Sequence, residues 1–182
     1  MKIKFALRFI AAFTLLLATW ASAGFGTAYR TAALELARLV SPALTGWWLE
    51  FGATDRSNPV FTKGGVEIPL QIDVSLLSMA QVPLQALICA TPGLGLVGTV
   101  GRCVIGMVAF FLVHVLVLLI YPVVLAHPSW WTDTLGVFSG LLSFVLAPQL
   151  LWFILTYPRL KELWHLGSVS APAATGTKGL AS

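Results

Sequence analysis

Charged residues are scarce in this sequence: they make up 10% of the chain, against 58% hydrophobic residues. A soluble domain carries about 25% charged and about 45–50% apolar residues. A soluble fold could not cover its surface with so few charges, and the mean hydropathy of +0.88 leads to the same conclusion. The composition excludes a free cytosolic enzyme and a disordered chain, and it predicts an integral membrane protein whose first partner is the lipid bilayer.

Cysteines are also few, since the chain has only Cys89 and Cys103. Two cysteines are too few for the framework of a secreted disulfide-rich domain. The net charge of +4 and the pI of about 9.4 would suit a nucleic-acid partner in a soluble protein. In a membrane protein, however, the placement of basic residues matters more than their sum. We therefore expect no nucleic-acid partner.

Four runs without charge are long enough to predict transmembrane helices, each of which needs about 20 apolar residues. They fall at residues 9–29, within residues 74–101, at residues 103–121 and at residues 134–157. Pro83 predicts a kink in the second helix, because proline removes a backbone donor. The glycines that follow Thr91-Pro92-Gly93 predict a turn over residues 91–101. The expected fold is all-α, a bundle of about four transmembrane helices.

The first apolar run has a second interpretation. Residues 1–23 carry a basic start, an apolar stretch and Ala21-Ser22-Ala23, which resembles the cleavage site of a signal peptide. We favour a retained helix over residues 1–29, because the apolar run continues past this site and three more predicted helices follow. Both interpretations leave residue 30 on the same side of the membrane.

The distribution of basic residues predicts the orientation. With the N-terminus inside, seven basic residues and only Glu162 face the cytoplasm, whereas the outer side has four basic and six acidic residues. Cytoplasmic segments of membrane proteins are enriched in Lys and Arg. We therefore predict a multi-pass protein of a bacterial inner membrane with both termini cytoplasmic. The inner basic residues are Lys2, Lys4, Arg8, Arg102, Arg159, Lys161 and Lys178.

Residues 30–73 form the only sizeable segment predicted outside the membrane. Apolar residues at helical spacing predict an amphipathic helix over residues 30–51 that lies along the outer interface and ends at Trp47-Trp48. A continuation of the first helix out of the lipid is the alternative. Short β-type runs on either side of Lys63-Gly64-Gly65 predict a hairpin. Residues 74–166 hold the three remaining helices, and the polar tail at residues 167–182 is predicted to be disordered.

Four side chains are candidates for chemistry. A membrane thiol peptidase would use Cys89 or Cys103 with a base that lowers the thiol pKa, and Arg102 is the only basic residue close in sequence. His114 is the one ionisable residue deep inside a predicted helix, which makes it a candidate site. Simple packing explains all four as well, and we expect no metal and no small-molecule cofactor. For His114 we expect a hydrogen bond to Ser75, Ser78, Ser139 or Ser143.

The run Ala90-Thr91-Pro92-Gly93-Leu94, followed by Arg102, Gly106 and a helix with His114, resembles the exosortase and archaeosortase group. The nearest likeness is to the exosortase H-associated membrane proteins, and the run over residues 147–153 also fits. Exosortases process C-terminal sorting signals with a Cys, an Arg and a further Arg or an Asn-x-x-Arg segment on successive helices. Residues 114–117 here read His-Val-Leu-Val, so the catalytic set is incomplete.

The resemblance therefore implies a non-catalytic accessory subunit of an inner-membrane protein-sorting or surface-polymer system, with another membrane protein as its partner. Two alternatives stay open. One is a membrane-embedded thiol peptidase or transpeptidase that uses Cys89 or Cys103 with Arg102 and His114. The other is a small transporter component.

Overall fold

The computed structural model describes residues 2–22, 24–51, 59–71, 74–127 and 129–163, and these residues are mostly helical (80%). The predicted disordered tail at residues 167–182 lies outside the described residues, as do Lys178 and the last residue of the possible cleavage site, Ala23. The helices, in chain order, are α1 (Lys2–Ser22), α2 (Phe25–Thr45), α3 (Val74–Met79), α4 (Gln81–Ala90), α5 (Leu96–Ala126), α6 (Trp130–Leu141), the π-helix η1 (Leu142–Leu146) and α7 (Ala147–Leu163).

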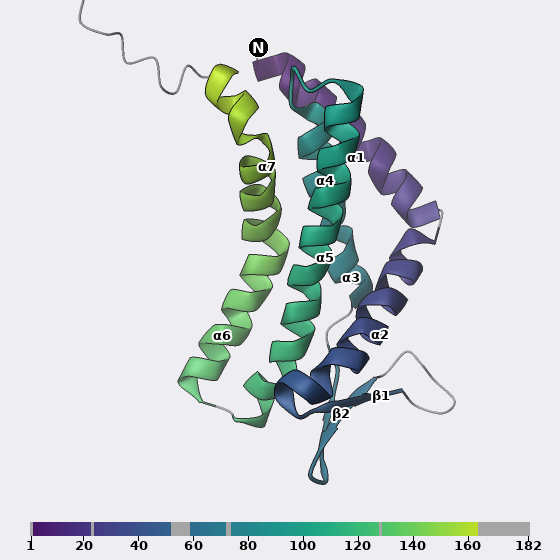
Figure 1. Cartoon of the computed structure of the whole chain (residues 1–182), viewed down its shortest axis with the longest axis vertical. Helices are drawn as coiled ribbons and strands as arrows, with labels where there is room; N and C mark the ends of the chain where they lie inside the picture. The colour runs from purple at the N-terminus through teal and green to yellow at the C-terminus, as the bar shows by residue number, and fades with distance from the viewer. Residues whose placement is uncertain (1, 23, 52–58, 72–73, 128, 164–182) are drawn as a thin grey trace, which may run out of the picture.

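These helices form four columns along the long axis of the molecule (Figure 1). The first column is α1 followed by α2, the second is α3 followed by α4, the third is α5, and the fourth is α6, η1 and α7. Consecutive columns run in opposite directions, so the N-terminus and the end of α7 lie at the same end of the molecule. Helix α1 packs on α4, α2 packs on α5, and α5 also contacts α4 and α7.

Two helices among the described residues are long and apolar enough to cross a membrane, Ile3–Ser22 and Leu96–Ala126. They differ in their surroundings. The apolar stretch of α1 has no buried residue, whereas that of α5 is 39% buried inside the chain. Helix α5 is therefore the central element of the bundle, and α1 lies at its periphery.

The predicted first helix over residues 9–29 is wrong at its end, because α1 stops at Ser22 and a new helix starts at Phe25. Gly24 between them has φ 69, in the left-handed region that ends an α-helix. A Cβ at Gly24 would meet nothing within 4 Å, so the backbone conformation rather than crowding favours glycine there. Tyr29 consequently belongs to α2.

The predicted helix over residues 30–51 is also too long, because α2 ends at Thr45. Gly46, with φ 71, caps it and donates its N–H to the carbonyl of Pro42. Trp48 then begins a strand instead of closing the helix. Helix α2 extends the column that α1 begins and packs against α5, but it is a separate helix and not a continuation of α1.

The predicted kink at Pro83 appears as a break between α3 and α4, three residues earlier. Pro83 has no N–H to donate to the carbonyl of Met79, four residues before it, so the helix is interrupted there. The predicted turn is shorter than expected: α5 begins at Leu96 rather than at residue 103. The charge of Arg102 does not end the helix, because its guanidinium donates to the carbonyls of Gly98 and Leu155.

The fourth predicted helix, over residues 134–157, lies inside a longer helical column from Trp130 to Leu163. The sequence did not predict that this column contains a π-helical segment, η1. One turn of π-helix holds more residues than one turn of α-helix. The segment therefore changes the direction in which the side chains of α7 point relative to those of α6.

A three-stranded antiparallel sheet closes the end of the molecule opposite the N-terminus (Figure 1). Its strands, in the order β1-β2-β3, are β1 (Trp48–Glu50), β2 (Val60–Lys63) and β3 (Val66–Pro69). The predicted hairpin of β2 and β3 is confirmed, and its turn residues Gly64 and Gly65 both have positive φ, as a two-residue hairpin turn requires. Strand β1 was not predicted.

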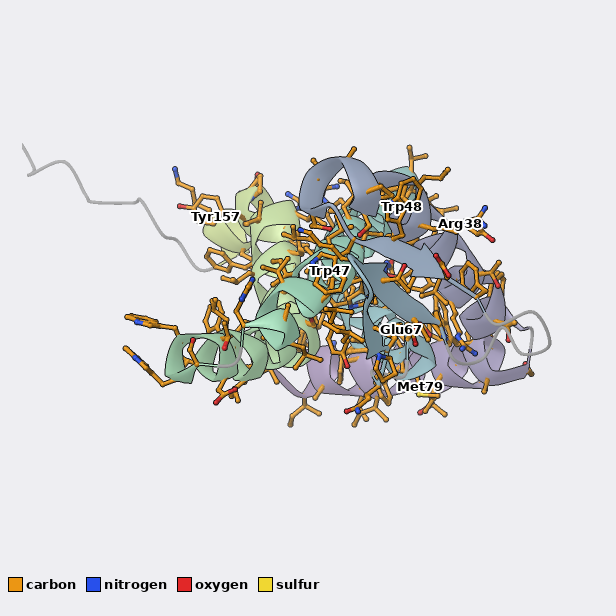
Figure 2. The ribbon with its side chains drawn as sticks, turned by 90° about the horizontal axis from the view of Figure 1, so that it is seen from below. Arg38, Trp47, Trp48, Glu67, Met79 and Tyr157 are labelled. Atoms are coloured by element: carbon orange, nitrogen blue, oxygen red, sulfur yellow. The ribbon has the colours of Figure 1, made fainter. Side chains whose placement is uncertain are left out.

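The sheet rests on the helices through an apolar cluster. Leu49, Phe61 and Ile68 lie on one face of the sheet, opposite each other in register, and they pack on α2 and α5. Trp47 points into this cluster and is 5% exposed, whereas Trp48 is 61% exposed and points outward (Figure 2). A second apolar cluster fills the other half of the bundle, formed by Ala80, Leu84, Ile88, Phe110 and Ala147.

Candidate functional site

His114 lies about one turn past the middle of α5, and none of its surface is exposed. The ring of Phe110, one turn earlier, is 4.3 Å from the imidazole between ring centroids. Burying a polar group without a hydrogen bond costs several kcal/mol in an apolar environment. The position of His114 therefore requires a partner on another helix.

That partner is Tyr29 of α2, whose hydroxyl lies 2.6 Å from Nδ1 of His114. His114 has a hydrogen bond as predicted, but its partner is Tyr29, and neither Ser78 nor Ser143, the two predicted serines whose side chains are described, is bonded to it. Ser78 instead accepts a hydrogen bond from the indole of Trp20, at 3.3 Å. The side chains of Ser75 and Ser139 lie outside the described residues.

Two glutamines of α4 extend this contact into a row. Nε2 of Gln81 donates to the hydroxyl of Tyr29 at 3.3 Å and to the carbonyl of Met107 at 3.1 Å. Nε2 of Gln85, one turn later, lies 3.5 Å from Oε1 of Gln81 and donates to the carbonyl of Cys103 at 3.2 Å. The row Gln85–Gln81–Tyr29–His114, which we call the polar row, links α2, α4 and α5 between the two apolar clusters.

The polar row has one direction. The hydroxyl of Tyr29 accepts from Gln81 and keeps its own proton free for donation to Nδ1 of His114; in that arrangement His114 is neutral with its proton on Nε2. Hydrogen bonds that run in the same sense polarise one another. Within the described residues, Oε1 of Gln85 at the start and Nε2 of His114 at the end are buried and have no protein partner.

In the part of the chain that the structure describes, the polar row therefore has a free buried acceptor at one end, Oε1 of Gln85, and a free buried donor at the other, Nε2 of His114. Such a row can hold a small polar molecule by hydrogen bonds or fix the register of three helices. Sequence analysis missed Tyr29, Gln81 and Gln85. The available signal was the spacing of the two glutamines, which are four residues apart on an otherwise apolar helix and therefore share one face.

The two thiols lie next to the Gln85 end of the polar row, since Cys89 follows Gln85 by one turn of α4 and the carbonyl of Cys103 accepts from Gln85. Sγ of Cys89 on α4 lies 3.9 Å from Sγ of Cys103 on α5, and both cysteines are free. Arg102 is adjacent in sequence, but its Nε and Nη1 donate to the backbone carbonyls of Leu155 and Gly98. The structure thus brings the two thiols together and engages the arginine elsewhere.

His114 does not join the thiols. It lies eleven residues beyond Cys103 on the same helix, which corresponds to about 16 Å along the axis at 1.5 Å per residue. A peptidase that pairs a thiolate with an imidazole needs the two side chains within hydrogen-bonding reach. Across the described ranges, no three His, Cys, Asp or Glu side chains are grouped so that they could hold a metal ion.

In comparisons with known proteins, no family model, no curated protein and no solved structure matches this chain. The resemblance to the exosortase group therefore stays a prediction that rests on the residues quoted for it.

Proposed function

We propose that the chain is a multi-pass protein of a bacterial inner membrane in which all four columns cross the bilayer and both termini are cytoplasmic. The 31 residues of α5 measure about 46 Å at 1.5 Å per residue, more than the roughly 30 Å of a hydrocarbon core. Lys4 and Arg8 lie at the start of the first column and Arg159 and Lys161 at the end of the last, so these four basic residues share one end of the molecule. That clustering supports an inside location for this end.

Within this topology we propose a non-catalytic accessory subunit of a protein-sorting or surface-polymer system. The observation that carries the proposal is the attachment of the sheet to the bundle. Besides the apolar cluster, three polar contacts hold the sheet region. Lys63 Nζ donates to the carbonyl of Thr45, the Tyr121 hydroxyl donates to the carbonyl of Pro69, and the backbone N–H of Gln71 donates to the Tyr121 hydroxyl.

The attached sheet leaves two large apolar side chains exposed, Trp48 on the face away from the helices and Val66 at the hairpin tip on the other face. Trp48 and Val66 are both exposed, and Figure 2 shows Trp48 at the rim of this end of the molecule. Exposed aromatic side chains on a rigid surface are typical of protein contacts. This sheet of β1, β2 and β3, which we call the platform, is fixed on the proposed outer side of the membrane. It suits a subunit that holds a partner in place better than a subunit that binds a substrate in a cleft.

The positions of the candidate catalytic residues favour this function over a thiol peptidase. Cys89 and Cys103 contact each other but not His114, and Arg102 is bound to backbone carbonyls. The accessory function predicts that the double variant Cys89→Ala, Cys103→Ala still supports the partner's activity in cells. A variant that accumulates normally but loses that activity would favour the peptidase.

Site-directed photo-crosslinking in intact cells tests the platform. A photoreactive residue at position 48 or 66 should give one discrete product of higher mass, because the partner contacts the sheet. The matched control is position 137 on α6, which is also exposed but should lie in the hydrocarbon and react with lipid only. Mass spectrometry should identify the partner as an enzyme of a sorting or polymer system. Absence of any protein product at both sheet positions would refute the accessory function.

Reporter fusions test the topology independently. An enzyme active only outside the cytoplasm should be active when fused after residue 60 and silent when fused after Lys161. The reverse pattern would refute the orientation.

A further inference from the structure

A small cavity lies at the end of the molecule where the chain begins. Its volume is about 150 Å³, and it is lined by Lys4, Phe5 and Arg8 of α1, by Ala90 at the end of α4 and by Pro92 of the turn that follows. The lining thus combines two cationic side chains with three apolar ones. None of the four side chains of the polar row lines this cavity, and the sheet lies at the opposite end of the molecule.

The two cations of the cavity have no acidic partner among the described residues. Lys4 and Arg8 are four residues apart and therefore lie on the same face of α1. The ion pairs found in the described part of the chain are Arg38 with Glu35 and Arg159 with Glu162. Glu162, the one acidic residue near this end, is thus already paired, and the cavity keeps an uncompensated positive charge.

The walls of the cavity are held in place by α7. The ring of Phe5 contacts Trp152, with centroids 6.3 Å apart, and the indole N–H of Trp152 donates to Oγ1 of Thr91 at 2.9 Å. Arg159 Nε donates to the carbonyl of Gly93 in the same turn, at 2.9 Å. Three columns therefore fix the positions of α1 and the turn, so the cavity is a built feature of the fold rather than a gap at a loose end.

We propose that this cavity binds a phosphate group and that its source is an anionic phospholipid of the cytoplasmic leaflet. Arg presents a planar fork that matches two phosphate oxygens, and Lys adds a compact charge. The apolar lining suits the carbon atoms next to the phosphate, and the exposed side chains of Leu7 and Ile10 continue along α1 as a surface for acyl chains. Basic pockets between transmembrane helices bind lipid headgroups in this way.

The lipid source rests on the proposed membrane topology, but the phosphate chemistry does not. The test uses the full chain in a neutral detergent, with lipid retention measured by native mass spectrometry against added dioleoylphosphatidylglycerol. The wild type should retain this lipid in preference to the zwitterionic dioleoylphosphatidylcholine. Lys4→Gln and Arg8→Gln should each weaken retention about fivefold, as expected for about 1 kcal/mol per basic residue near a lipid headgroup. The matched control is Lys161→Gln, which removes one charge from the same end without lining the cavity.

Inorganic phosphate distinguishes the two sources. If millimolar phosphate displaces the lipid from the wild type, and binds with the same dependence on Arg8, the site recognises phosphate from solution. If it does not compete, the lipid is the ligand. Arg8→Lys keeps the charge, so it should bind the lipid more tightly than Arg8→Gln does. If the substitutions acted by unfolding the chain, Arg8→Lys and Arg8→Gln would lose equal affinity. Equal melting temperatures of all variants would confirm that the fold is kept.

Two results would overturn the proposal. The first is an equal loss of retention in Lys161→Gln, since general surface charge would then explain binding. The second is no preferential binding of either phosphatidylglycerol or phosphate. A failed topology does not produce these results, because the detergent measurement does not depend on which side of the membrane Lys4 faces.

Discussion

The hydrogen bond between Tyr29 and His114 can be measured by a double-mutant cycle. Tyr29→Phe removes the hydroxyl that donates to Nδ1 of His114 and accepts from Gln81, so two contacts are lost together. His114→Leu removes only the first, because Tyr29 can still accept from Gln81. The expected loss is therefore larger for the tyrosine than for the histidine.

The magnitudes follow from the environment. Interhelical hydrogen bonds in membranes are worth about 0.6 kcal/mol on average and at most about 1.7 kcal/mol, and a buried group left without a partner costs about 1–3 kcal/mol. We expect Tyr29→Phe to lower the free energy of unfolding by about 2 kcal/mol and His114→Leu by about 1 kcal/mol. Because both variants remove the same bond, the double variant should lose about 2 kcal/mol, which gives a coupling energy of about 1 kcal/mol.

Reversible unfolding of the purified chain in mixed micelles, followed by circular dichroism during titration with dodecyl sulfate, gives these free energies. Thr156→Val serves as the control partner for Tyr29→Phe, because Thr156 is buried on α7 and bonds its own helix at Trp152. That pair should be additive to within about 0.3–0.5 kcal/mol. If Tyr29→Phe and His114→Leu were equally additive, the two side chains would not be bonded and the polar row would be wrong.

Three further predictions concern the joints of the bundle. Mild oxidation of the purified protein should join Cys89 to Cys103, because their sulfurs are 3.9 Å apart and need only a small approach to form a bond of about 2.05 Å. Measurement of the intact mass should then show a loss of two hydrogens. Full retention of both thiols after oxidation would contradict the packing of α4 on α5. Gly24→Ala should lower the free energy of unfolding by about 1–2 kcal/mol, because a φ of 69 disfavours a residue with a side chain. The control is Gly95→Ala, which should have little effect on the melting temperature, because Gly95 has a φ of −67 and open space around the new Cβ. Gly106→Ala should lower the free energy of unfolding by about 1–3 kcal/mol through overpacking, because the added Cβ would lie 3.2 Å from side chains of both α4 and α7. If Gly106→Ala had the same melting temperature as Gly95→Ala, these helices would not be in close contact.

The column arrangement was largely predictable, because the length and spacing of apolar runs are properties of local sequence. The hairpin was predictable for the same reason, since Gly64-Gly65 between short β-type runs is itself a turn signal. The break before Pro83 follows from the chemistry of one residue. Strand β1 was not predictable in this way, because its partner β2 is separated from it in the sequence by residues 51–59. In addition, Trp47-Trp48 is typical of a helix end at a membrane interface.

The polar row shows where local reasoning stops. The sequence indicates that a buried His114 needs a partner, but it does not say which residue, since Tyr29 is 85 residues away. Whether Tyr29 faces α5 depends on the start of α2, which Gly24 sets by ending α1. A glycine in an apolar run is often tolerated inside a helix. Only the left-handed conformation of Gly24 reveals that a new helix begins there.

The π-helical segment between α6 and α7 has a consequence for how this chain can vary. A residue deleted from Leu142–Leu146 would let the column close into regular α-helix and keep the later side chains close to their present directions, whereas a residue deleted from α6 would turn every later side chain by about 100°. After such a deletion in α6, Arg159 would leave the carbonyl of Gly93, and Trp152 would leave Thr91. Within the column from α6 to α7, this segment is therefore the place where the loss of one residue disturbs the contacts of α7 least.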